Sequence, residues 1–201
     1  MKSAAVQTAR PRRSYRQTAR AASAQATRAR VVEAFQPRLE EHWFEDIRLE
    51  DVARDAAVTV QTVIRLFGGK DGLLSATIDR MVDTAKLIRR TTSHEPAAAV
   101  RAIIRSYEDI GDLVMRLLAQ EERHPAIRRV TDVGRVEHRA LLAEFFADRL
   151  SPLPEIEARR RLDALVVATD LYVWKLIRRD MRRSVSELQA LMERMIRSAL
   201  A

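Results

Sequence analysis

The sequence predicts an all-α protein, and three observations point to that class. Segments of about 20 to 30 residues lie between prolines and glycines, and apolar residues recur within them at three- and four-residue spacing. Alternating β-branched runs are missing, and no Asn-Gly or Asp-Gly pair joins such runs into a hairpin. The 201 residues, 47% hydrophobic and 32% charged, are enough to bury the core of one large domain or two small ones.

Prolines, glycines and capping residues set the expected helices. Pro96 opens one helix, because its missing N–H is harmless in a first turn, and Ser184 with Glu187 forms a capping box that opens the last helix. Pro37 predicts a kink or an early turn in the first helix, and Gly134 predicts a break. The expected helices cover about 22–42, 49–56, 60–67, 70–90, 96–120, two helices within 125–150, then 154–180 and 185–200.

Basic residues concentrate at the N-terminus. Residues 1–30 hold eight lysines and arginines and no acid, whereas residues 31–201 hold 28 residues of each sign, so the whole net charge of +8 lies in this arm. Such an arm suits a polyanion, since each neutralised phosphate releases condensed counterions. An organellar transit peptide or an idle tail has a similar composition.

Several classes of site are excluded by composition. The absence of cysteine removes disulfides, thiolate zinc sites, iron–sulfur clusters and cysteine nucleophiles. The longest apolar run, 164–168, is far shorter than the roughly 18 residues of a membrane span. Glu121 and His124 form one Glu-x-x-His half-motif without a second copy, so no metal or cofactor is expected. We expect a soluble, cytoplasmic protein without a membrane partner, and the lack of a nucleophile elbow or phosphate loop disfavours an enzyme.

Residues 49–67 predict a helix-turn-helix. Val52 and Ala53 form the inner face of a short helix, Thr59 caps a second helix, and Val63 and Phe67 turn inward on it. Two short helices joined by a tight turn, with small polar residues leading the second, are typical of DNA-binding units. A plain helical hairpin with an apolar inside has the same periodicity.

From residue 31 to residue 74 the sequence resembles, without a gap, the TetR family of bacterial transcriptional regulators. The matching residues are Val31-Val32-Glu33-Ala34, Val52-Ala53, Ala56-Ala57-Val58-Thr59, Thr62-Val63, Phe67-Gly68-Gly69-Lys70 and Leu73-Leu74. The stretch from Arg161 to Asp170 and the last helix also resemble the family's dimerising pair. The resemblance implies an N-terminal three-helix helix-turn-helix DNA-binding domain and a C-terminal helical ligand-binding and dimerisation domain. The expected domains are a basic flexible arm at 1–21, the helix-turn-helix domain at 22–74, and the effector-binding and dimerisation domain at 75–201.

The resemblance implies DNA contacts residue by residue. Gln61 would read adenine through its amide, and Arg65 would reach guanine or a phosphate. Lys70 falls on the family's phosphate-contacting lysine at a helix start, and Thr62 on its phosphate-contacting threonine. The residues expected at DNA are Thr59, Val60, Gln61, Thr62, Ile64, Arg65, Lys70 and Arg48, with Arg12, Arg13 and Arg16 of the arm.

Four features of this segment depart from the family pattern. Ile64 replaces a tyrosine of the recognition helix, so it either contacts a thymine methyl group or packs inward. Ala57 stands where the turn usually has glycine, and Ile47 where a capping threonine is common, so Asp46 is expected to cap the second helix. Residues 31–75 carry five basic against nine acidic residues, so affinity is expected to depend strongly on the arm and on salt.

The C-terminal half offers candidates for dimerisation and for ligand binding. Two apolar stripes predict a four-helix dimer interface, although part of each stripe must be intradomain core. The stripes contain Leu162, Leu165, Val166, Thr169, Val173, Leu188, Leu191, Met192 and Met195. Candidate effector-binding residues are Tyr107, Met115, Arg116, His138, Phe145, Tyr172 and Trp174. Each of these residues is also consistent with a place in the core. The two basic candidates, Arg116 and His138, are also consistent with ion pairs to Glu108, Asp112 or Glu137.

The sequence therefore predicts a homodimeric, ligand-responsive transcriptional regulator, specifically a repressor. It would bind a palindromic operator in double-stranded DNA and respond to an unidentified small-molecule effector. The alternative is a helical interaction protein whose basic arm binds polyanions without sequence preference.

Overall fold

The computed structural model describes residues 12–90 and 96–201, with side chains in 21–81 and 97–201. No strand occurs among these residues, which confirms the all-α class. The elements are α1 (Arg12–Glu41), η1 (Phe44–Asp46), α2 (Leu49–Asp55), α3 (Val60–Phe67), α4 (Lys70–Arg90), α5 (Pro96–Leu118), α6 (Pro125–Phe145), α7 (Ala147–Leu150), α8 (Glu155–Ala168), α9 (Leu171–Lys175), η2 (Leu176–Asp180) and α10 (Val185–Leu200).

Most of the expected helices agree with the structure to within two residues, as α2, α3, α4, α5 and α10 show. The first helix was expected from about residue 22, but α1 already begins at Arg12. α1 also runs through Pro37, which does not end it early. Phe35 and Leu39, on either side of the proline, are at most 1% exposed. Burial of two such side chains stabilises the helix by more than the roughly 3 kcal/mol that an internal proline costs.

The expected break at Gly134 is wrong, because α6 continues through it to Phe145. A glycine costs a helix only about 1 kcal/mol relative to alanine, and buried residues on both sides, Ile127 and Leu142, hold the helix in place.

The helix expected at 154–180 is interrupted at Thr169 and Asp170. Asp170 accepts a hydrogen bond from the Tyr172 amide at 2.7 Å and so caps a new helix, α9. α9 then widens into η2, a π-helical turn in which the Met181 amide donates to the Leu176 carbonyl at 2.8 Å. The capping box expected at the last helix is confirmed, with Ser184 and Glu187 each bonding the other's backbone amide.

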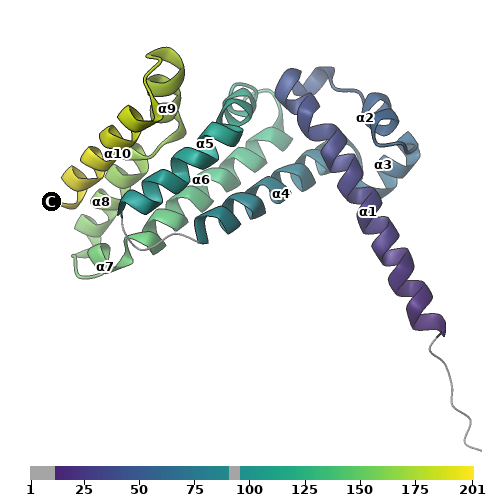
Figure 1. Ribbon diagram of the computed structural model, residues 1–201, viewed down its shortest axis with the longest axis horizontal. Helices are drawn as coiled ribbons and strands as arrows, with labels where there is room; N and C mark the ends of the chain where they lie inside the picture. Colours follow the sequence, from purple (N-terminus) through teal and green to yellow (C-terminus); the bar gives the residue numbers. More distant parts are fainter. Residues whose placement is uncertain (1–11, 91–95) are drawn as a thin grey trace, which may run out of the picture.

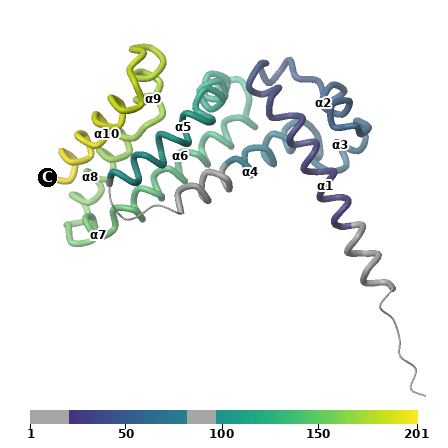
Figure 2. Tube along the Cα trace, in the orientation of Figure 1, coloured from purple at the N-terminus to yellow at the C-terminus, as the bar shows by residue number. Residues whose placement is uncertain are grey.

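The helices form an elongated molecule (Figure 1). α1 and the two short helices α2 and α3 lie at one end, α8 and α10 lie at the other, and α4, α5 and α6 run between them. The N-terminal half of α1 projects beyond the body in Figure 1. Figure 2 shows the same arrangement of α5, α6, α8 and α10 as a tube. None of the helices within the described ranges is long and apolar enough to span a membrane.

Two clusters of buried side chains stabilise the fold. The first cluster joins α1, α2, α3 and α4 to the end of α5 and the start of α6, where Leu117 and Ile127 are 2% and 0% exposed. The second cluster fills the C-terminal end around Trp174, Leu165 and Met192. The helix-turn-helix unit therefore shares its core with the α5–α6 corner and is not tethered by α4 alone.

Candidate functional site

The helix-turn-helix is built by local capping and one tight turn. The Thr59 hydroxyl accepts from the Thr62 amide at 3.2 Å and lies 3.0 Å from the Thr62 hydroxyl, which fixes the start of α3. Ala57 has a φ of 53° in the turn, the left-handed conformation that the family's glycine adopts without strain. Gly68, with a φ of 78°, ends α3.

The second helix of the unit, α3, separates a buried face from an exposed one. Val63 is 0% exposed and Phe67 9%, as the sequence predicted. Gln61, Ile64 and Arg65 lie together on the opposite face, and Ile64 is 42% exposed, so it does not pack inward. Two other candidates are less available: Val60 packs against the first core cluster, and the Thr62 hydroxyl is used at the helix cap.

Two arginines of the helix-turn-helix unit are paired with acidic residues, and two others are exposed and available to DNA. Arg38 bonds Asp55 at 2.6 Å, and Arg54 bonds Asp51 at 2.7 Å. Arg48 and Arg65 are exposed, and no hydrogen bond or ion pair is recorded for either guanidinium within the described part of the chain. The expected cap by Asp46 is wrong: Asp46 lies in η1, and the N-cap residue of α2 is Arg48, whose side chain makes no capping bond.

The Lys70 ammonium is held by backbone rather than left free. It donates to the carbonyls of Phe44, Glu45 and Ile47 at 2.7, 3.1 and 2.9 Å, and it lies 4.7 Å from the centre of the Phe44 ring. Three carbonyls use all three of its protons. Burial lowers the pKa of this ammonium below its ordinary value, against the attraction of Asp71, Asp46 and Glu45. A phosphate contact at Lys70 would have to displace one of these carbonyls.

The basic N-terminal helix is anchored to α3. Arg28 donates to the Leu66 carbonyl at 2.6 Å and stacks 4.3 Å from the centre of the Phe67 ring, while Arg30 reaches the Ala56 carbonyl at 3.4 Å. These contacts fix the direction in which α1 leaves the helix-turn-helix. The side chains of Arg12, Arg13 and Arg16 lie outside the described ones, so their expected role is untested.

The structure brings three of the candidate effector-binding residues together around Thr169. Tyr107 donates to the Thr169 carbonyl at 3.0 Å, His138 Nε2 lies 3.0 Å from its hydroxyl, and the rings of Tyr107 and Trp174 are 6.2 Å apart. Tyr172 lies apart from them, being 55% exposed.

The other candidates lie toward the ends of α5 and α6. Phe145 packs edge-on against Phe146, with ring centres 5.2 Å apart. Met115 is packed against the second core cluster, and Arg116 is half-buried on the last turns of α5.

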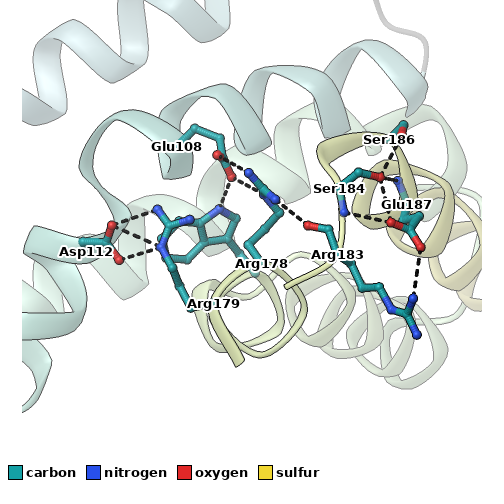
Figure 3. Close-up of polar contacts among 9 residues, drawn as sticks. Glu108, Asp112, Arg178, Arg179, Arg183, Ser184, Ser186 and Glu187 are labelled. Atoms are coloured by element: carbon teal, nitrogen blue, oxygen red, sulfur yellow. Dashed lines mark hydrogen bonds and ion pairs between the residues drawn. The ribbon is translucent and has the colours of Figure 1, made fainter. Parts of the chain in front are cut away.

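Trp174 is the centre of a polar clamp between α5 and the α9–η2 segment. Figure 3 shows the Glu108, Asp112, Arg178 and Arg179 side chains of this clamp. Its side chain is 0% exposed and lies against Gly111, where an added Cβ would meet the ring at 2.5 Å. The indole N–H donates to Glu108 at 2.7 Å, Arg178 also bonds Glu108, and Arg179 bonds Asp112 and stacks on the indole. These pairings were not predicted from the sequence, because partners about 70 residues away cannot be inferred from spacing.

Part of each apolar stripe lies in the core of the chain. Leu165, Thr169, Leu188 and Met192 are each 0% exposed, so they lie in the chain's own interior. The remaining residues of the stripes, Leu162, Val166, Val173, Leu191 and Met195, are half-buried beside them. A different set of apolar residues is exposed along α8, α9 and η2, and we call it the outer strip: Ile156, Val167, Tyr172 and Leu176, exposed by 62%, 65%, 55% and 50%.

Acidic and histidine side chains are used in structural contacts. Glu121 bonds Arg135 at 2.7 Å and Thr131 at 2.5 Å, and His124 lies 3.4 Å from Glu45. Among the residues that the structure describes, no group of three histidine, cysteine, aspartate or glutamate side chains could hold a metal ion.

Curated relatives of this chain are regulators of transcription. An HTH-type transcriptional regulator BetI from Burkholderia thailandensis is 30% identical over 151 residues, which cover 69% of this chain and 77% of the relative. The BetI regulator from Paraburkholderia xenovorans is 28% identical over 154 residues, 71% of this chain and 77% of that protein. No protein-family model matches.

Solved structures show the same fold. A transcriptional regulator from Rhodococcus sp. Rha1 aligns with a TM-score of 0.67 at 17% identity, covering 86% of this chain and 95% of that one. A TetR transcription regulator from Haloarcula marismortui aligns with a TM-score of 0.56 at 15% identity, covering 87% and 96%.

Proposed function

The chain belongs to the TetR family of transcriptional regulators, and from this membership we propose that it is a ligand-responsive repressor that binds a palindromic operator as a homodimer. The observation that supports DNA reading best is the exposed face of α3. There, Gln61 offers an amide, Ile64 an apolar tip and Arg65 an unpaired guanidinium, side by side on one helix. These three chemistries suit adenine, the thymine methyl group and guanine in a major groove.

In this proposal, the rest of the molecule adds to the affinity for DNA and sets the distance between the two α3 helices. Arg48 at the start of α2 and the arginines of α1 contact phosphates, which fix the position of the protein on the duplex without reading sequence. Two chains joined through the outer strip and its half-buried neighbours set two α3 helices about one helical turn of DNA apart. A small molecule in the C-terminal domain releases the operator by binding more tightly to a different spacing.

The test is selection of random duplex DNA by the purified full-length protein at physiological salt, followed by sequencing. An enriched palindrome with half-sites about 10 base pairs apart supports the dimeric regulator. Retention of DNA without enrichment would instead support the alternative, a helical interaction protein that binds polyanions through its basic arm.

A second experiment tests Ile64 directly. We expect that replacing one thymine of each half-site by deoxyuridine, which lacks only the methyl group, weakens binding about fivefold, since an apolar contact to that methyl is lost. In Ile64→Ala the same replacement should have little effect. Equal sensitivity of both proteins at every thymine would remove Ile64 from the reading face.

A further inference from the structure

Phe44 connects the helix-turn-helix to the C-terminal domain through its backbone. It lies in η1, four residues before the Arg48 cap of α2, and it is only 4% exposed. Its amide donates to Gln120 Oε1 at 2.8 Å, and its carbonyl accepts from Lys70 at 2.7 Å. One residue thus links the end of α5 to the start of α4.

Gln120 is buried and held in a single orientation. Its side chain is 2% exposed, and its Nε2 donates to the Arg116 carbonyl at 2.9 Å, so the amide oxygen is directed at Phe44. Gln120 also accepts at its carbonyl from the amides of Arg123 and His124, at 3.0 and 3.2 Å, and so organises the turn between α5 and α6.

The same turn holds η1 through a second contact. The His124 ring packs edge-on against the Phe44 ring, with centres 5.5 Å apart, and His124 Nε2 lies 3.4 Å from the Glu45 carboxylate. We call Phe44, Gln120 and His124 the clasp. The clasp fixes η1 to the α5–α6 corner independently of the covalent connection through α4.

We propose that Gln120 is a positioning residue for DNA binding, because its buried hydrogen bond to the Phe44 amide sets where the helix-turn-helix sits relative to the C-terminal domain. This inference rests on the proposed function. A buried amide bond tolerates little displacement, since an unpaired N–H in the interior is costly. Any shift of the α5–α6 corner therefore moves η1, and with it the Arg48 cap and the α3 helix that packs on α2.

The clasp supplies a route to the DNA-binding unit that does not pass along α4. A dimer holds its two α3 helices at a fixed separation only if each helix-turn-helix is fixed to its own C-terminal domain. Without the Gln120 bond, the position of the helix-turn-helix must be fixed when it binds DNA. The entropy cost of fixing it lowers the affinity for the operator. Contacts made by the arm to phosphates do not depend on that spacing.

The experiment compares Gln120→Met with Thr77→Val in the full-length protein. Methionine has nearly the shape of glutamine but lacks the amide oxygen that accepts the hydrogen bond from the Phe44 amide. Thr77 is 0% exposed and donates to the Leu73 carbonyl within its own helix, so Thr77→Val removes a buried hydrogen bond of α4 without touching the clasp. Both variants are measured well below their unfolding midpoints.

In Gln120→Met, we expect affinity for the selected operator to fall about tenfold, while affinity for random duplex DNA is unchanged. The Phe44 amide should also exchange with solvent about tenfold faster by NMR. Thr77→Val should retain operator affinity within about twofold at a comparable loss of thermal stability.

Three results would overturn the proposal: unchanged or increased operator affinity in Gln120→Met, an equal loss in Thr77→Val, or unchanged exchange at Phe44. Failure of the proposed function looks different, since the wild-type protein would then select no operator while amide exchange at Phe44 would still report on the clasp.

Discussion

The surroundings of Lys70 determine which partner its ammonium contacts. Resemblance places it at a phosphate, but the structure surrounds its ammonium with three carbonyls of the η1 segment. The sequence does not distinguish a phosphate contact from a contact with these carbonyls, because both roles need a lysine at the start of a helix. The three-dimensional position of η1 decides which partner is within reach.

We expect Lys70→Met to lower the free energy of unfolding by about 2 kcal/mol, because three carbonyls lose a charged donor. The dependence of operator affinity on salt should remain unchanged, since no phosphate contact is removed. Chemical unfolding and binding at a series of salt concentrations measure the two effects. A salt slope smaller by about 0.9 for each Lys70 would instead support the phosphate contact.

Ionisation of Glu108 makes the stabilising effect of the Trp174 clamp depend on pH. Hydrogen bonds from Arg178, together with one from Trp174, hold the pKa of Glu108 below its ordinary value, and burial opposes them only in part. A carboxylate with a lowered pKa stabilises the folded state above its unfolded pKa, and this contribution is lost as pH falls through the folded pKa.

We therefore expect Glu108→Gln to lower the thermal unfolding midpoint at pH 7, with the difference from wild type shrinking below about pH 4. Glu144→Gln is the matched control, since Glu144 is exposed and no ion pair is recorded for it in the described part of the chain. A difference for Glu108→Gln that is constant from pH 7 to pH 3 would contradict the assignment.

At the scale of elements, helix starts were easier to predict than helix interruptions. Thr59 and Ser184 act through hydrogen bonds to residues three positions on, and Pro96 acts through its fixed φ, so all three effects depend on the local sequence. Pro37 and Gly134 also act locally, but burial of flanking residues outweighs them. The cap at Asp170 was missed because apolar periodicity continues across it.

The projecting N-terminal part of α1 carries the next prediction. Deletion of residues 1–25 removes six basic residues, and the described side chains from 21 to 25 are all exposed, so no core is lost. We expect weaker operator binding and a salt slope reduced by about 0.9 for each lost phosphate contact. Titrations of affinity against salt measure this, with the unfolding midpoint as the control for folding. An unchanged slope would show that the arm is idle.

At the scale of the whole molecule, one core joins the DNA-reading end to the α5–α6 corner. The outer strip lies at the opposite end, on α8, α9 and η2. This arrangement separates the surface available to a second copy from the surface available to DNA.

We expect the double variant Val167→Asp and Tyr172→Asp to be monomeric, because two buried charges in an apolar interface are unfavourable. Operator affinity should fall at least about 100-fold, since the second half-site is no longer held nearby. Ultracentrifugation and operator titration measure both effects. Ile64→Asp, at an exposed apolar position on α3, should lose operator binding but keep the oligomeric state. A dimeric double variant would exclude the outer strip.

The sequence by itself determined the helix class, most helix bounds, the basic arm, the helix-turn-helix and the family, because these depend on local spacing and capping. Only the tertiary structure decided which apolar residues are interior and which are exposed, so Leu165 and Met192 became core while Val167 and Tyr172 remained outside. It also paired Glu108 with Arg178 and Phe44 with Gln120. These partners are 70 and 76 residues apart along the chain, and only folding brings them within bonding distance.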